Sequence, residues 1–273
     1  MNGAKRTRIV ICGAAGRMGR RLVALAREDA ALQVAGAVEH AGHATLGEDV
    51  GVVAGVGSLG VTITSDLAAA LPGANVVIAF VNEPAASMEQ AQLCARAGIA
   101  LVVGTTGLSA DQEKDFRREA AAIPVVKASN FSVGVAVLVH LVERAAALLG
   151  PSFDCEIIEA HHTRKKDAPS GTALSLAQAA ARARGWKLDE VARHGREGIV
   201  GERPAKEIGL HAVRAGDIVG QHTVLFGGTG ETVELVHRAQ SRDTFAMGAL
   251  RAAKWVIGRP PGVYDMRDVL DLP

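Results

Sequence analysis

The sequence predicts an α/β protein of two domains. Its 273 residues exceed the usual size of one domain. Over the first 130 residues, short β-branched runs alternate with alanine-rich stretches, which is typical of βαβ units and a parallel sheet. After Asn130 the pattern changes to apolar helices followed by strands alone. We therefore expect a parallel-sheet domain over residues 1–130 and an α+β domain with a mixed sheet over residues 131–240.

The elements of the first domain follow from apolar runs and helix-end signals. Pro84 suits the first turn of a helix, Ser109 an N-cap and Gly98 a C-cap. Strands are expected at Arg8–Cys12, Val34–Glu39, Asn75–Phe80, Ile99–Val103 and Pro124–Lys127. Helices are expected at Gly16–Arg27, Pro84–Ala97 and Ala110–Ala122. The glycine-rich stretch 41–60 has weak periodicity and is predicted to be a long surface loop.

The second domain is expected to combine two helices with a mixed sheet. The helices are predicted at Val133–Leu149 and Thr172–Arg184. The strands are predicted at Asp154–Ala160, Ile208–Arg214, Ile218–Phe226 and Thr232–His237. Residues 215–217 and 227–230 have the composition of hairpin turns between the last three strands.

Composition and charge exclude several classes of protein. Apolar residues make up 48% of the chain and charged residues 22%, as in soluble α/β proteins. A net charge of +1 gives no general attraction for nucleic acid or an anionic membrane, and no run is expected to span a membrane. Three separate cysteines without a CxxC pair argue against disulfides and a structural zinc site. We expect a cytoplasmic protein without a metal site or a nucleic-acid partner.

A glycine-rich turn joins the first predicted strand to the first predicted helix. Gly13 permits a tight turn, and Gly16 and Gly19 permit close backbone approach. The free N–H groups at the start of the helix can hold a pyrophosphate, to which Arg17 would add a cation. Because Ala15 replaces the middle glycine of the commoner pattern, a merely tight βα turn is the alternative.

Glu39 ends the second predicted strand, where a carboxylate would meet the hydroxyl groups of an adenosine ribose. A plain solvated strand end is the alternative for this residue. Together with the glycine turn, Glu39 predicts a Rossmann-type domain that binds a nicotinamide dinucleotide.

Two further polar segments follow predicted strands of the parallel sheet. They are Gly104–Gly107 and Ala128–Phe131. Open parallel sheets bind their ligands at the carboxyl ends of the strands, where hydroxyl and backbone groups of these segments can reach a nicotinamide. An ordinary turn is the alternative for the first segment, and capping of the next helix is the alternative for Asn130.

The densest polar cluster, residues 159–172, lies between a predicted strand and a predicted helix. Two imidazoles and three cations occur in six residues and can bind a substrate with two carboxylates. The N–H groups near Gly171 and Thr172 can hold one carboxylate, with Ser170 as N-cap. Crowding among the three cations eases proton release from one lysine, which suits an acid. A solvated basic loop is the alternative.

These segments, with residues 130–135, 213–220 and 265–270, resemble the dihydrodipicolinate reductase family of lysine biosynthesis over nearly the whole chain. The resemblance implies reduction of 4-hydroxy-tetrahydrodipicolinate by NADH or NADPH with loss of water. It implies that His161 donates and accepts a proton and that Lys165 donates one. His162, Gly171 and Thr172 would hold the carboxylates of the substrate. It also implies a homotetramer and a C-terminal segment, residues 241–273, that returns to the dinucleotide domain.

The resemblance also implies which residues contact the cofactor, all of them at sheet ends. They are Gly13, Ala14, Ala15, Gly16, Arg17, Met18, Glu39, His40, Gly104, Thr105, Thr106, Ala128, Ser129, Asn130 and Phe131. His40 stands where relatives that favour NADPH often have arginine, and Val81 lacks a hydroxyl group usual in relatives. We therefore expect both NADH and NADPH to serve.

Other functions make different demands on the sequence. A semialdehyde dehydrogenase needs a cysteine nucleophile, and none of the three cysteines is well placed. Another two-domain NAD(P)-dependent amino-acid dehydrogenase is the main enzymatic alternative, although it does not explain two histidines followed by a basic run. A DNA-binding redox sensor would need a basic helix-turn-helix extension, which the pattern does not contain.

Overall fold

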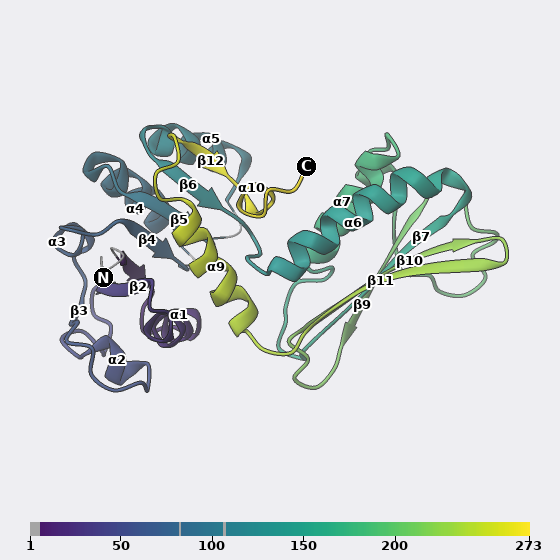
Figure 1. Ribbon diagram of the computed structural model, residues 1–273. Coiled ribbons are helices and arrows are strands. Elements are labelled where there is room, and N and C mark those ends of the chain that lie inside the picture. Colours follow the sequence, from purple (N-terminus) through teal and green to yellow (C-terminus); the bar gives the residue numbers. More distant parts are fainter. Residues whose placement is uncertain (1–5, 82, 106–107) are drawn as a thin grey trace. The chain divides into compact units, whose positions relative to one another are not determined.

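The computed structural model describes residues 6–81, 83–105 and 108–273. The chain divides into two compact units (Figure 1). The first unit contains residues 1–132 and 243–273, and the second contains residues 133–242. Each boundary lies two residues after the position expected from the sequence. The two units are described separately.

The first unit contains a parallel sheet of seven strands in the order β12-β6-β5-β4-β1-β2-β3. Every residue of β4 is fully buried. Because successive side chains of a strand point to opposite faces, both faces of this sheet are covered by helices. The strands are β1 (Thr7–Cys12), β2 (Leu32–Val38), β3 (Ile63–Thr64), β4 (Val76–Ala79), β5 (Ala100–Val103), β6 (Pro124–Lys127) and β12 (Gly262–Tyr264).

The helix-end signals read from the sequence are confirmed in the first unit. Pro84 begins a helix, and Gly98 ends it with a left-handed φ of 65°. Ser109 and Gln112 form a capping box at the next helix. The helices are α1 (Arg17–Glu28), α2 (Val50–Val53), α3 (Leu67–Ala70), α4 (Pro84–Ala97), α5 (Ala110–Glu119) with the 3₁₀ turn η1 (Ala120–Ala122), α9 (Asp243–Trp255) and α10 (Met266–Val269).

The C-terminal segment of the chain completes the first unit. Its strand β12 adds to the edge of the sheet beside β6. Its helix α9 packs on α1, where Arg21 pairs with Asp243 at 2.6 Å and Asp29 pairs with Lys254 at 2.5 Å. A segment far away in sequence therefore stabilises the helix that begins at the glycine turn.

Residues 41–60 are more ordered than the predicted surface loop, because they contain helix α2. Asp49 caps this helix by accepting hydrogen bonds from the N–H groups of Gly51 and Val52. Its carboxylate also accepts from the N–H groups of Leu59 and Gly60. These backbone hydrogen bonds stabilise the charged carboxylate and lower the pKa of Asp49.

The second unit contains a mixed sheet of five strands in the order β11-β10-β7-β9-β8. The turn at residues 227–230 is confirmed as a hairpin, since β10 pairs with β11 up to Gly228 and Glu231. The predicted hairpin at residues 215–217 is wrong, because β7 lies between β9 and β10 and pairs with both. The strands are β7 (Asp154–His161), β8 (Ala192–His194), β9 (Ile208–Arg214), β10 (Gly220–Gly228) and β11 (Glu231–Ala239).

Two long helices, α6 (Val133–Leu149) and α7 (Gly171–Ala183), pack on this sheet, and the short elements η2 (Gly150–Ser152) and α8 (Leu188–Val191) join them to strands. Among the described residues, one segment, Val133–Ser152, is long and apolar enough to cross a membrane, with 20 residues and a mean hydropathy of 1.7. In length and composition, this segment corrects the expectation that no run could span a membrane. Helix α6 buries Leu138 and Val142 in the core of the second unit, which accounts for part of its apolar character.

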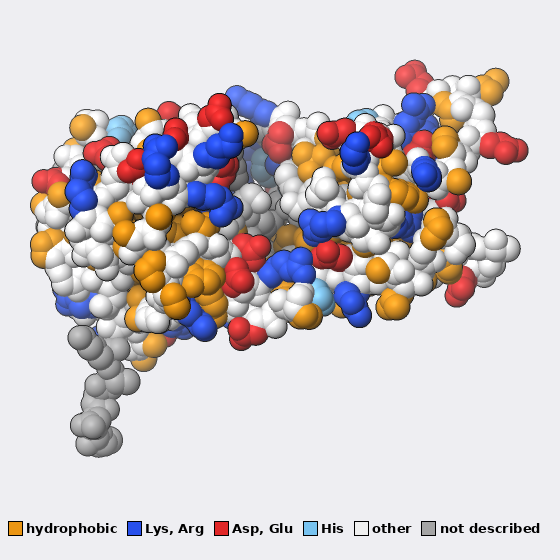
Figure 2. Space-filling model, turned by 90° about the horizontal axis from the view of Figure 1, so that it is seen from above, with side chains coloured by type: hydrophobic (Ala, Val, Ile, Leu, Met, Phe, Trp, Pro, Cys, Tyr) orange, Lys and Arg blue, Asp and Glu red, His pale blue; other side chains and the backbone are white. Residues whose placement is uncertain are grey.

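Charged side chains of both signs are interspersed on the face of the protein drawn in Figure 2. This distribution agrees with the small net charge of the chain, +1. Local groups must therefore provide any attraction for an anionic ligand.

Candidate active site

The glycine turn between β1 and α1 has the geometry of a dinucleotide-binding turn. Gly13 has a φ of 76°, which favours glycine. A Cβ atom on Gly19 would lie 2.1 Å from the carbonyl oxygen of Gly13, so only glycine lets the helix pack this closely on the turn. Gly16 is the N-cap of α1, and no side chain of the described residues caps its first turn. The N–H groups of that turn are thus suited to an anion.

Glu39 connects the end of β2 to this turn. Its Oε1 accepts a hydrogen bond of 2.9 Å from the N–H group of Ala15, and only 9% of the residue is exposed. The carboxylate is therefore held in place, which a plain solvated strand end would not be. His40 and Arg17, which were predicted beside it, are both exposed, and Ala14 is buried under the turn.

A cavity of about 830 Å³ opens over the turn and the end of β2. Its lining includes Gly13, Glu39 and His40 on one side and Phe80 and Gln90 on the other. The volume of this cavity and its position over the glycine turn fit a dinucleotide.

The two segments after β5 and β6 contribute less than their side chains suggested. The hydroxyl of Thr105 donates to the carbonyl oxygen of Val81 at 2.8 Å and accepts from Ser87 at 2.6 Å, inside the protein. Gly104 has no room for a side chain, because a Cβ atom would lie 2.4 Å from the ring of Phe80. Thr106, also predicted to contact the cofactor, lies outside the described residues.

The side chains of residues 128–131 also contribute less to a cofactor site than the sequence suggested. The side chain of Asn130 accepts a hydrogen bond of 2.8 Å from the N–H group of Ser132, which forms an Asx-type turn just before α6. Phe131 is 1% exposed and packs on Phe80, and Ala128 is half-buried. Of the four predicted residues, Ser129 is exposed. Contacts from this segment to a cofactor would rely mainly on backbone groups.

In the second unit, His161 is the last residue of β7 and lies in a chain of charged hydrogen bonds. Its Nδ1 is 2.5 Å from Oε2 of Glu159, which is 1% exposed. Arg214, at the end of the neighbouring strand β9, donates to both carboxylate oxygens of Glu159, at 2.8 and 2.9 Å. The carboxylate therefore receives a bidentate arginine and fixes the ring of His161 with Nε2 as its remaining titratable atom.

Burial and charge set the protonation of this group in opposite directions. Burial lowers the pKa of His161 below its usual 6.5, although Glu159 acts to raise it. Burial acts to raise the pKa of Glu159, but hydrogen bonds from Arg214 and His161 outweigh burial and lower it. At neutral pH the pair is thus a carboxylate beside a mainly neutral imidazole.

The remaining predicted residues follow β7 in the next dozen positions. The Nζ of Lys165 is 2.8 Å from Oδ2 of Asp167, a partner that the sequence analysis did not assign. The Nδ1 of His162 is buried without a hydrogen-bond partner in the described part of the chain. Gly171 and Thr172 form the first turn of α7, which Ser170 caps through a hydrogen bond of 3.1 Å from the N–H of Ala173.

His222 is a buried residue of this site that sequence reasoning missed. It lies on β10, and its ring centroid is 5.2 Å from that of His161. Its Nε2 is 3.1 Å from the hydroxyl of Ser170. Burial, helped by the charge of His161, lowers the pKa of His222 to about 4. Strand alternation on β10 marks His222 as an inward position, which is the signal that would have found it.

The three cysteines are buried and free. Burial raises the pKa of each thiol. A thiol held in its protonated form is a weak nucleophile, so the semialdehyde dehydrogenase hypothesis has no support here.

A Rossmann-type unit joined to an α+β unit with a buried carboxylate–histidine pair defines a two-domain dinucleotide-dependent oxidoreductase. The sequence matches "Dihydrodipicolinate reductase, N-terminus" over residues 7–131 and "Dihydrodipicolinate reductase, C-terminus" over residues 134–270. The chain therefore belongs to the dihydrodipicolinate reductase family. Members of this family are NAD(P)H-dependent oxidoreductases.

Individual relatives agree with this family over nearly their full lengths. The 4-hydroxy-tetrahydrodipicolinate reductase of Anaeromyxobacter dehalogenans (strain 2CP-C) is 51% identical over 97% of this chain and 98% of its own. The enzyme of the same description from Geobacter sulfurreducens is 48% identical over 97% and 99%. A solved structure, "Dipicolinate bound Dihydrodipicolinate reductase from Paenisporosarcina sp. TG-14", has a TM-score of 0.76 and 25% identity over 95% of this chain and 97% of its own.

Proposed function

We propose that this protein reduces 4-hydroxy-tetrahydrodipicolinate to tetrahydrodipicolinate, with release of water, in the biosynthesis of lysine and diaminopimelate. The single observation that carries the proposal is the Arg214–Glu159–His161 chain, which is followed directly by the cationic segment and the N-terminus of α7. That arrangement combines a titratable imidazole with groups that bind carboxylates. Family membership supports the same reaction.

The first unit binds the cofactor in this proposal. When bound, NADH or NADPH supplies the hydride. The N–H groups at the start of α1 bind the pyrophosphate, and Glu39 accepts hydrogen bonds from the adenosine ribose. The cavity over the turn supports this assignment.

The second unit binds the substrate and handles its protons. The N–H groups of Gly171 and Thr172 hold one carboxylate at the helix N-terminus, and His162 with its buried free Nδ1 holds the other end of the substrate. Lys165 donates a proton from Nζ, and Asp167 keeps that group near the site. His161 exchanges a proton at Nε2, because Glu159 occupies Nδ1.

Assembly and location complete the proposal. We infer a cytoplasmic homotetramer in which the second unit provides both substrate-binding and oligomerisation surfaces. One observation supports association through its sheet. Ile158, Val213 and Val236 are 37%, 44% and 39% exposed, and the strand register puts all three on one face of the sheet. Exposed apolar side chains on one sheet face are typical of an interface.

A steady-state assay with freshly generated 4-hydroxy-tetrahydrodipicolinate tests the reaction and the cofactor choice together. Oxidation of both NADH and NADPH, dependent on substrate, is the expected result. Pyridine-2,6-dicarboxylate, which a solved relative is described as binding, should compete with the substrate. No turnover with either cofactor would refute the proposal.

A further inference from the structure

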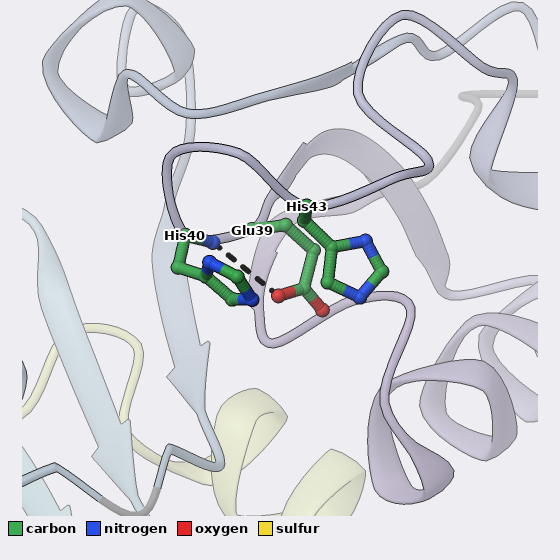
Figure 3. Close-up of side chains that lie close together, drawn as sticks. All are labelled: Glu39, His40 and His43. Carbon is green, nitrogen blue, oxygen red and sulfur yellow. Dashed lines mark hydrogen bonds between the residues drawn. The ribbon is translucent and has the colours of Figure 1, made fainter.

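Three potential metal ligands come together at the mouth of the cofactor cavity. Glu39, His40 and His43 each offer one ligand atom, and these atoms all lie within 4.8 Å of one another. Figure 3 shows the carboxylate of Glu39 between the two imidazole rings. The ring centroids of the two histidines are 5.1 Å apart. All three side chains line the same cavity, so a ligand can reach the group they form.

Local hydrogen bonds decide which ring nitrogen of each histidine carries the proton. The Nδ1 of His40 is 3.0 Å from the carbonyl oxygen of Ala41, which can only accept, so Nδ1 carries the proton and Nε2 is free. This is the arrangement in which metal-bound histidines usually occur. The Nδ1 of His43 accepts a hydrogen bond of 3.2 Å from the N–H group of Thr45 and lies 2.9 Å from the hydroxyl of the same residue. The proton of the neutral ring is therefore on Nε2, and a metal that binds there displaces it.

The third ligand is anchored from the opposite side. The Oε1 of Glu39 is occupied by the N–H group of Ala15, while Oε2 has only a long contact of 3.3 Å with the N–H group of His40. Oε2 can therefore accept a metal without loss of the bond that positions the carboxylate. Gly42, with a φ of 84°, lies in the turn between the two histidines, which a hydrogen bond of 3.1 Å from the N–H group of His43 to the carbonyl oxygen of His40 closes.

We propose that Glu39, His40 and His43 bind a divalent transition-metal ion of the Zn²⁺ class in the cofactor cavity, and that this ion excludes the dinucleotide. Two imidazoles and one carboxylate form a known zinc ligand set that leaves a fourth position for water. Nitrogen ligands favour Zn²⁺, Co²⁺ and Ni²⁺ over Mg²⁺ and Ca²⁺. The exclusion rests on the proposed function, because it requires the same carboxylate to bind the adenosine ribose.

The test uses the full chain without added histidines, first treated with EDTA and then dialysed. Titration with Co²⁺ should give the visible absorption of a single site, and calorimetry with Zn²⁺ should give one ion per chain. Mg²⁺ at the same concentration should give no signal. NADH should weaken the apparent affinity for Zn²⁺, and Zn²⁺ should weaken that for NADH.

Two variants locate the site. His43→Ala should weaken binding of Co²⁺ and Zn²⁺ by at least about tenfold, as loss of groups in a metal site generally does. His194→Ala is a matched change of an exposed histidine on β8 and should leave the affinity for both ions unchanged. Absence of binding, or binding that His43→Ala does not weaken, would overturn the metal site.

The outcomes also separate this proposal from the proposed function. Metal binding that depends on His43 but is unaffected by NADH would overturn the exclusion together with the ribose role of Glu39. If the protein does not reduce the substrate in EDTA, where no metal occupies the site, the proposed reaction is wrong. A metal titration that depends on His43 would still support the metal site in that case.

Discussion

The candidate sites of the two units consist of different kinds of chemical group. In the first unit the predicted contacts are largely backbone groups, and side chains such as Thr105 and Asn130 hydrogen-bond inside the protein. In the second unit the site consists of ionisable side chains such as His161, whose neighbours come from other strands. Binding of a cofactor by the first unit therefore depends on the space around its backbone groups. The chemistry of the second unit depends on the charge of its side chains. The predictions below test that contrast.

The largest effect is expected from Lys165→Ala in the second unit. Loss of a general acid typically costs roughly 100-fold to 10,000-fold in rate, so kcat should fall by that range. The affinity for NADH, measured by its fluorescence, should not change. Lys166→Ala, which alters the exposed neighbour, is the matched control. Unchanged turnover in the Lys165 variant would contradict its assignment as an acid.

The second prediction concerns stability in acid. Because the pKa of His222 falls from 6.5 to about 4 on folding, the unfolded chain takes up a proton first as the pH decreases. The free energy of unfolding does not depend on His222 above about pH 6.5, where this residue is neutral in both states. Between that pH and about pH 4, protonation of His222 in the unfolded chain lowers the free energy of unfolding by on the order of 3 kcal/mol. Urea denaturation at several pH values measures this decline.

The variant His222→Gln should show a flatter dependence of its denaturation midpoint on pH. His194→Gln, at an exposed histidine of the same unit, should keep the slope of the unchanged protein. Equal slopes in all three proteins would mean that another group is responsible for the acid sensitivity.

A steric change should separate the first unit from the second. In Gly19→Ala the new Cβ would lie 2.1 Å from the carbonyl oxygen of Gly13, so the turn must shift. Overpacking of this kind costs about 1–3 kcal/mol, and an equal loss of binding free energy at the shifted turn weakens NADH binding by roughly 5-fold to 160-fold. Binding of pyridine-2,6-dicarboxylate should persist, as a dicarboxylate titration would show. Loss of both affinities would indicate general unfolding instead.

The smallest effect is expected from His40→Arg at the edge of the cofactor cavity. A permanent guanidinium at this exposed position can pair with the 2'-phosphate of NADPH, and such pairs contribute about 0.2–1 kcal/mol. The ratio of kcat/KM for NADPH to that for NADH should therefore rise by no more than about fivefold. An unchanged ratio would show that the 2'-phosphate does not lie beside His40.

Particular elements show how far the sequence could predict the structure. The strand β6 and the helices α4 and α6 begin and end where the sequence placed them, because apolar runs and end signals such as Gly98 are local. The short elements β3 and α3 were missed, since two to four residues carry too little periodic signal. The hairpin at residues 215–217 was misassigned because turn composition does not reveal which strands pair.

By itself, the sequence determined the α/β class, the glycine turn and the cluster that begins at Glu159, because these depend on neighbouring residues and on spacing. Only the tertiary structure decided which side chains from distant segments contact one another in the site. Arg214 reaches Glu159 because β9 pairs with β7, and His222 lies beside His161 because β10 pairs with β7 on the other side. The physical reason is that strand order sets which distant side chains meet, and the hydrophobic pattern of one strand does not specify its neighbours.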